Sequence, residues 1–439
     1  VAHTFGRTNI GTLVIDNGWI VTNAISVINA NTMTYYTTFL LDTLYEGASN
    51  PWGLAVSSDS ETLWVSVAGI HKVYKIDLLN LHSLMAGNVT GTLDLYHRDK
   101  SGLAKPYSDI WHRIKADSSE LSKLKNDLGA LWGADLLTKI ELDGEGPRGL
   151  DMAPSGLELA VGSYFEGEVY LIDASTDAVT TTIALGSQPA DDSQRTGERL
   201  YNDGATTLGT WLSCSSCHPD ARPDGVRWDL GNDGIGNYKT TKTHVNAFQN
   251  VPTTWRGVRP DAATSVESGF KFIKFRWPEG DDVYHVNNYI RNLQAEVSPF
   301  RNLSDDTMTA SAQAGQTLFN GAAGCSGCHS GSYYTNLNTY DVGTADATDI
   351  DGYYVVPQLI ELWRTAPYLH DGSAATMSDV FTEAPGMGNT SSLTGTQKTQ
   401  LADFLLQIDN VGPGPTPTPT PGPPPSPVPP PTPAPTPPP

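Results

Sequence analysis

The placement of its cysteines constrains this chain more than any other feature. All four cysteines fall in two Cys-x-x-Cys-His motifs, and none is left over for a structural disulfide. In such a motif the two thiols bond to the vinyl groups of a haem, and the histidine becomes an axial ligand of its iron. The sequence therefore predicts two covalently attached c-type haems. The attachment residues are Cys214, Cys217 and His218 in the first motif and Cys325, Cys328 and His329 in the second.

Other uses of paired cysteines fit this pattern less well. A zinc site with four cysteine ligands would have to join two distant pairs, and it would not need a histidine after each of them. A thioredoxin-like redox pair needs neither that histidine nor a second copy. Because haem of this kind is attached in export compartments, we expect a periplasmic, cell-surface or extracellular protein.

The charge balance narrows the set of partners. The chain has 27 lysines and arginines against 48 aspartates and glutamates, which gives a formal net charge of −21. Nucleic acid and anionic membrane surfaces both attract a basic face, so neither is expected as a partner. A protein that donates electrons to this chain is expected to be small and basic.

Two targeting signals are expected to be absent. No apolar run is long enough for a membrane-spanning helix. The chain opens at Val1 directly with strand-like sequence, without the charged and apolar regions of a signal peptide. We therefore expect the numbering to start after processing or within a longer precursor.

The first part of the chain, residues 1–190, is expected to be all-β. Two stretches within it, 50–77 and 146–173, match each other, because each has a turn with glycine, short alternating strands and a final Ile-Asp pair. This rhythm is typical of a β-propeller blade. An insert near 97–138, with helical spacing between 121 and 137, separates the copies. Only three or four blades fit, so we expect a propeller-like region that is small, truncated or completed by another chain, with another antiparallel β domain as the alternative.

After the β region the pattern changes to short helices between loops rich in Gly, Asn and Asp. We expect two mainly α-helical, cytochrome c-like domains, one for each haem motif, over 191–305 and 306–411. The predicted fold class is therefore multidomain. Helical spacing is clearest in 283–294, 311–319 and 396–408.

The chain ends in a Pro/Thr-rich tail over residues 412–439. From 413 onwards, 17 of 27 residues are proline. Such a tract buries no core and favours an extended polyproline II rod, so it is expected to act as a stalk or spacer, with an inert tail as the alternative.

Two segments carry a resemblance to a known family. The segment 363–377 reads Trp-Arg-Thr-Ala-Pro-Tyr-Leu-His-Asp-Gly-Ser-Ala-Ala-Thr-Met, and a fainter copy follows the first motif in 250–258 and 275–280. These segments resemble the bacterial di-haem cytochrome c peroxidases, a family that includes the di-haem enzyme which matures methylamine dehydrogenase. The chain most resembles the branch with YVTN-type β-propeller repeats ahead of the haems. The resemblance implies electron transfer between two haems and reduction of hydrogen peroxide with electrons from a small donor.

The resemblance also implies roles for single residues near the haems. Trp277 would lie between the haems and relay electrons, and His370 would lie near the second haem. His244 would be a removable distal ligand of the first haem iron, with His285 as the alternative. Met387 would be the axial ligand of the second haem iron.

A calcium site and an acid–base group are implied in the same way. Asn250, Thr365 and Pro367 match positions that bind Ca²⁺ between the haem domains, and oxygen ligands suit this ion. The aspartate that the family places shortly after Trp277 is absent from this sequence. The acid–base glutamate of the family has no clear counterpart, although Glu279 and Glu296 lie nearby in the sequence.

Two main functions follow from these observations. The first is an enzyme that reduces hydrogen peroxide. The second is a non-enzymatic surface cytochrome, in which the β region and the tail serve for display or assembly, as a homo-oligomer or as a subunit of an electron-conducting filament. A third, weaker hypothesis is oxidation of another substrate through the haems. Two features distinguish the first hypothesis from the second: whether the first haem iron has a permanent sixth ligand, and whether an acid lies beside that haem.

Overall fold

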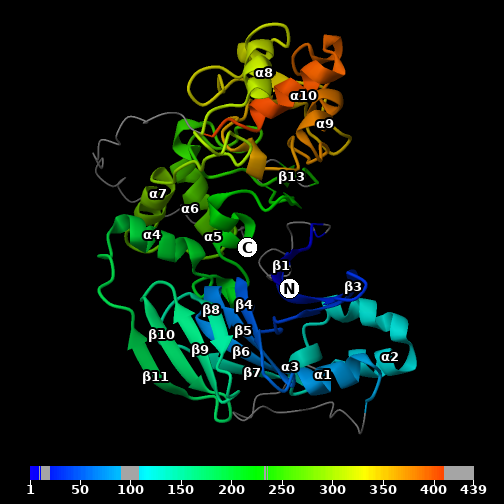
Figure 1. Ribbon diagram of the computed structural model, residues 1–439, viewed down its shortest axis with the longest axis vertical. Coiled ribbons are helices and arrows are strands. Elements are labelled where there is room, and N and C mark those ends of the chain that lie inside the picture. Colours follow the sequence, from blue (N-terminus) through cyan, green and yellow to red (C-terminus); the bar gives the residue numbers. More distant parts are fainter. Residues whose placement is uncertain (9, 11–19, 90–107, 232–233, 235, 410–439) are drawn as a thin grey trace, which may run out of the picture.

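The computed structural model describes residues 1–8, 10, 20–89, 108–231, 234 and 236–409. Strands occupy the first part of the chain and helices the second, as the sequence predicted (Figure 1). Three predicted segments lie wholly or partly outside the described residues. They are the start of the insert, the end of the second haem domain and the Pro/Thr-rich tail. Within the described part, no helix is long and apolar enough to cross a membrane.

Three antiparallel sheets make up the first part. In each four-stranded sheet, strands that follow one another in sequence are neighbours. The first sheet contains β1 (Ala2–Gly6), β2 (Val21–Asn29) and β3 (Thr34–Leu40). The second contains β4 (Pro51–Val56), β5 (Thr62–Val67), β6 (Lys72–Asp77) and β7 (Leu137–Glu141), and the third contains β8 (Pro147–Met152), β9 (Glu158–Ser163), β10 (Glu168–Asp173) and β11 (Val179–Ala184).

The two four-stranded sheets correspond to the two sequence repeats. Their first strands carry an irregularity of register at the same place, between Pro51 and Leu54 in β4 and between Pro147 and Leu150 in β8. The sheets lie side by side (Figure 1), and the Ser66 hydroxyl of one donates a 2.5 Å hydrogen bond to the Arg148 carbonyl oxygen of the other. A propeller is not confirmed: the described strands of the first part of the chain form two four-stranded sheets and one of three strands.

The insert lies between the third and fourth strands of the second sheet. It contains α1 (Leu78–Met85), α2 (Ile110–Ala116), η3 (Ser118–Asn126) and α3 (Ala130–Gly133), where η marks a 3-10 helix. The helical spacing expected as far as 137 ends earlier than predicted. Leu137 already belongs to β7, whose β-branched Thr138 and Ile140 pair with Lys75 and Val73 of β6.

The helical part begins after β11. Its first half contains α4 (Ser193–Asn202), η4 (Leu208–Thr210), α5 (Cys214–Cys217), η5 (Pro219–Ala221), β12 (Arg227–Trp228), β13 (Lys239–Thr240), η6 (Ala247–Gln249), α6 (Ala262–Phe272) and α7 (Asp282–Arg291). Its second half contains α8 (Ala310–Asn320), η7 (Cys325–Gly327), β14 (Thr339–Asp341), β15 (Tyr353–Val355), η8 (Leu362–Arg364), α9 (Met377–Glu383), η9 (Thr390–Ser392) and α10 (Gly395–Leu405). The helices expected in 283–294, 311–319 and 396–408 are present as α7, α8 and α10.

The two halves repeat one helix crossing. A Cβ atom on Gly197 of α4 would lie 1.9 Å from the carbonyl oxygen of His285 on α7. A Cβ atom on Gly315 of α8 would lie 1.9 Å from the carbonyl oxygen of Gln400 on α10. Each crossing therefore requires glycine. In both halves the helix with the glycine comes before the haem motif in the sequence, and the helix that it crosses comes after the motif.

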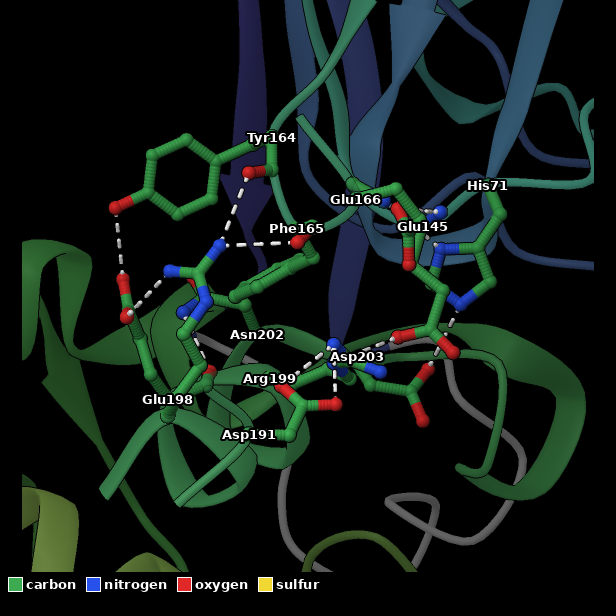
Figure 2. A network of polar contacts seen from close by, with 12 residues as sticks. His71, Glu145, Tyr164, Phe165, Glu166, Asp191, Glu198, Arg199, Asn202 and Asp203 are labelled. Atoms are coloured by element: carbon green, nitrogen blue, oxygen red, sulfur yellow. Dashed lines mark hydrogen bonds and ion pairs between the residues drawn. The ribbon is translucent and has the colours of Figure 1, made fainter. Parts of the chain in front are cut away.

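A polar network joins the sheets to the helical part (Figure 2). The Tyr164 hydroxyl donates a 3.0 Å hydrogen bond to Glu198 of α4, and Arg195 of the same helix donates one of 3.0 Å to the Phe165 carbonyl oxygen. His71, which follows β5, lies 3.5 Å from the carboxylate of Asp203 at the end of α4. The helix that leads to the first haem motif thus rests directly on the loops of the sheets.

Candidate functional site

One cavity joins the two Cys-x-x-Cys-His motifs. It has a volume of about 550 Å³, and the cysteines and histidines of both motifs line it. The four thiols form no disulfide with one another. Motifs that lie far apart in the sequence therefore open into the same space, and their cysteines remain free to bond to another group.

The first motif forms one helical turn, α5, with its own caps. The side chains of Ser213 and Ser216 make reciprocal hydrogen bonds to the backbone at the start of this turn. Pro219 disfavours helical backbone at the residue before it, and the helix ends at His218. His218 lines the cavity.

His218 and His244 meet inside the cavity. Their rings stack with 3.8 Å between centroids. Burial lowers the pKa of His218 to about 4 and holds the pKa of His244 well below its ordinary value, so both rings are neutral, the form that binds a metal. The Nδ1 atom of His244 is hydrogen-bonded to the Tyr201 hydroxyl at 2.8 Å, which leaves Nε2 for a ligand. The alternative, His285, is not among the described residues that line the cavity.

The second motif presents its histidine in the same way. The Nδ1 atom of His329 donates a 2.9 Å hydrogen bond to the Tyr334 carbonyl oxygen, which orients the ring and leaves Nε2 unprotonated. Met387 lines the cavity and packs in the same cluster as Cys325. A Cβ atom on the neighbouring Gly388 would lie 3.7 Å from the Cys325 sulfur. The structure therefore brings Met387 close to the second motif.

His370 lines the cavity and is paired with an acid. Its Nε2 atom lies 3.0 Å from the carboxylate of Asp349, and the Tyr354 ring stacks on it at 4.0 Å. Burial lowers the pKa of His370, although Asp371 and Asp349 oppose this shift. Burial alone would raise the pKa of Asp349, but hydrogen bonds, above all from Lys239, outweigh it and bring the pKa to about 2. Asp349 is far from His370 in sequence and carries no motif, so sequence reasoning missed it.

The three residues expected to bind calcium all line this cavity. The side-chain oxygen of Asn250 is buried without a hydrogen-bond partner in the described part of the chain, while its amide nitrogen donates to Asn246. An unpaired buried amide oxygen is costly unless it binds a cation or water, so Asn250 fits an oxygen-liganded ion. Thr365 and Pro367 lie in the same lining. No group of three His, Cys, Asp or Glu residues suited to a metal occurs among the described residues.

The structure corrects the position expected for Trp277. Its side chain is 74% exposed, and its ring lies under the Lys271 ammonium at 4.7 Å. The ring therefore stands on the surface rather than between the motifs. Trp255 does line the cavity, with its ring N–H donating to the Thr240 carbonyl oxygen at 2.8 Å. The sequence had placed Trp255 in the fainter family segment without giving it a role.

Neither candidate glutamate lies in the cavity lining. The Glu279 side chain is 80% exposed, and Glu296 forms an ion pair with Arg364 at 2.8 Å. The lining is basic instead, although the whole chain is strongly acidic. Its described residues include the basic Lys239, Lys242, Arg259 and Lys274 and the acidic Asp341.

Most of this positive charge has no acidic partner in the cavity. Lys239 is ion-paired with Asp349 at 2.6 Å. Within the described residues, the ammonium groups of Lys242 and Lys274 donate to carbonyl or hydroxyl oxygens and not to a carboxylate. Burial lowers the pKa of Lys242 to about 8. A bound group that carries carboxylates would compensate this charge.

Comparison with known proteins finds several distant relatives. No family model matches the chain. It is 27% identical over 271 residues to hydrazine synthase subunit gamma of Kuenenia stuttgartiensis, covering 48% of this chain and 76% of that protein. It is 25% identical over 287 residues to the cytochrome-c peroxidase IdrP1 of Denitromonas iodatirespirans, covering 48% and 73%. It is 24% identical over 226 residues to the methylamine utilization protein MauG of Methylophilus methylotrophus, covering 40% and 67%.

A solved structure is also similar. The crystal structure of a MauG-like protein associated with microbial copper homeostasis aligns with 52% of this chain and 91% of its own, at 20% identity and a TM-score of 0.39.

Proposed function

We infer the function of this chain from its membership of the di-haem cytochrome c peroxidase and MauG family, which uses haem for electron transfer. We propose that it is an exported cytochrome that passes electrons between two c-type haems and reduces hydrogen peroxide with electrons from a small, basic donor protein. The observation that carries this proposal is the shared cavity, because both haem motifs and two facing histidines line it.

The residues present fit two haems. Haem c supplies a one-electron redox centre and, where its sixth position is open, a site for peroxide. Each cysteine pair would hold one macrocycle through thioether bonds, with His218 and His329 as axial ligands. Lys242, Arg259 and Lys274, for which no ion pair occurs among the described residues, suit the carboxylates that haem carries.

The two sites would differ in their second axial ligand. His244, held by Tyr201, would close the first site, so peroxide requires that this ring move away. Met387 would close the second site and, as a thioether ligand, hold that haem at the higher reduction potential. Met387 would thus make the second motif the site that is reduced first.

Protons for the reaction would come from His370. Hydrogen peroxide takes up two electrons and two protons to give two waters. His370 is a buried ring in the cavity lining, and Asp349 holds its Nε2 atom, so we assign it as the proton-carrying group. Trp255, which lies in the same lining, takes the relay role expected of Trp277.

We also propose one Ca²⁺ between the two helical halves. Asn250 would bind it through its unpaired amide oxygen, and Thr365 and Pro367 through backbone carbonyl oxygens. This ion would fix the relative position of the halves and hence of the two haem motifs.

A second candidate function is electron transfer without catalysis. One observation favours it: Glu279 and Glu296 both lie outside the cavity, so neither stands where an acid would assist cleavage of the peroxide bond. Such a cytochrome would act in an assembly on the cell surface.

Optical and electron paramagnetic resonance spectra of the oxidised and half-reduced holoprotein separate these functions. Peroxidase action predicts a high-spin ferric signal that appears on half-reduction with Ca²⁺ and disappears when hydrogen peroxide is added. Two low-spin signals that ignore peroxide in every state would leave electron transfer alone. The haem content, counted by mass spectrometry, checks the premise of both.

A further inference from the structure

The sheets hold the segment that leads into the first haem motif. The Asn23 amide donates a 3.0 Å hydrogen bond to the Trp211 carbonyl oxygen. Gly47 and the segment exchange two more: the Gly47 amide donates to the Gly209 carbonyl oxygen at 2.8 Å, and the Thr210 hydroxyl donates to the Gly47 carbonyl oxygen at 2.7 Å. These contacts come from strand β2 and from the loop between β3 and β4.

Asn50 extends these contacts into the motif itself. Its amide nitrogen donates to the hydroxyls of Ser213 and Ser215, at 2.7 and 3.1 Å. The Ser216 hydroxyl donates to its amide oxygen at 2.7 Å. One side chain of the sheet region therefore contacts both residues between Cys214 and Cys217 and the N-cap before them.

The backbone of Asn50 is fixed as well. It has a left-handed φ of 55°, which asparagine tolerates better than most residues, and its carbonyl oxygen accepts a hydrogen bond from Ala68. The side chain is thus anchored on the sheet at one end and on the haem-attachment turn at the other.

The sheet region also supplies apolar wall to the first site. Ile20 and Val21 are each 2% exposed, line the cavity and pack in one cluster with Trp228, Leu212 and Cys217. In the described residues, no hydrogen bond joins the sheets to the second motif. The sheets therefore contact the two haem motifs unequally.

We propose that the sheet region is part of the first haem site and that Asn50 is a positioning residue for that haem. The proposal rests on the proposed function, because it assumes haem at the first motif. Asn50 would fix the attachment turn against the wall of Ile20 and Val21 and so keep water from this edge of the macrocycle. Less water favours the reduced state of a haem, so this contact raises the midpoint potential of the first haem.

The experiment is a redox titration of the holoprotein with each haem followed separately. Asn50→Gly removes the amide and relaxes the left-handed backbone, so it adds no strain. Asn50→Asp keeps the size and the preference for left-handed φ, but it cannot donate to the serines. Ser60→Gly, another left-handed residue of the sheet region at an exposed turn, is the matched control. The second haem is an internal control in every variant.

We expect Asn50→Gly to lower the midpoint potential of the first haem and to change its paramagnetic resonance signal, while the second haem stays as in the parent. Asn50→Asp should also lower the midpoint potential of the first haem, because its carboxylate adds a negative charge that favours the oxidised state. Ser216→Ala should shift the midpoint potential of the first haem less in the Asn50→Gly background than in the parent, because Asn50 and Ser216 act through one contact.

Three outcomes are distinguishable. Unchanged potentials in Asn50→Gly, with both haems attached, would overturn the inference and leave the proposed function intact. An equal shift of both haems would also overturn it, because it would report general loosening. A parent protein that carries fewer than two haems would instead defeat the proposed function.

Discussion

The buried side chain of Asp349 makes the stability of the fold depend on pH. Its pKa of about 2 lies below the usual 3.8. A carboxyl whose pKa is lower in the folded state stabilises the fold above its unfolded pKa, and this stability is lost as the pH falls towards the folded pKa. We expect the free energy of unfolding to drop between about pH 4 and pH 2, by roughly 2 kcal/mol from this group.

Chemical unfolding at a series of pH values measures this effect. Asp349→Asn should lose most of the drop, whereas Asp306→Asn, a change of an exposed acid at a left-handed position that asparagine tolerates, should keep it. If both variants follow the parent, the stabilisation does not come from the pairing of Asp349 with Lys239 and His370.

His244 gives the residue-scale test of the peroxidase proposal. His244→Gly removes the ring that stacks on His218 and should open the first haem without half-reduction. We expect a high-spin signal in the oxidised variant and faster reaction with hydrogen peroxide than in the parent. His285→Gly should change neither, because His285 lies outside the cavity lining. If His285→Gly instead gave the high-spin signal and the faster reaction, His285 and not His244 would be the distal ligand of the first haem.

At the scale of elements, the two glycine crossings are the most sensitive points. Gly315→Ala places a methyl group 1.9 Å from a backbone oxygen of α10, which no rotamer change relieves. We expect it to lower the free energy of unfolding by about 1–3 kcal/mol. Gly395→Ala meets nothing within 4 Å at the start of α10 and should be neutral or slightly stabilising. Thermal unfolding of both holoprotein variants checks this difference.

Elements also show how far sequence reasoning reaches. The repeats 50–77 and 146–173 and the helices α7, α8 and α10 follow from local alternation and helical spacing, which neighbours in sequence determine. The exposed position of Trp277 could not be predicted in this way. A family resemblance aligns residues in sequence, but it does not show how a turn packs. The contact between Asn50 and the first haem motif could not be predicted either, because no sequence motif or repeat links residue 50 to residues 213–216.

The two helical halves are joined by a buried ion pair at the scale of the whole molecule. Arg222 lies four residues after His218, and its guanidinium makes two hydrogen bonds to Glu361 in the second half, at 2.9 and 3.1 Å. The Glu361 side chain is 1% exposed. Removing one partner of such a pair leaves a buried charge, which costs about 3–5 kcal/mol.

A double-mutant cycle measures this connection. Arg222→Met alone should be strongly destabilising, whereas Arg222→Met with Glu361→Gln should recover most of the loss, because no unpaired charge remains and the Gln oxygen can still accept the Glu296 N–H. Arg256→Met, which breaks a partly exposed ion pair with Asp351, should cost much less. Additive losses at Arg222 and Glu361 would mean that each acts through its other contacts.

The shared cavity has a consequence for how the mature protein is made. Its walls come from β2 and from both helical halves, so the haems of the proposed function would be surrounded by parts of the chain that are far apart in sequence. Residues 20 and 21 precede both motifs in the chain and leave the ribosome first. On the proposed function, the two thioether bonds of the first haem would therefore form more readily before the sheets dock on α5 than after.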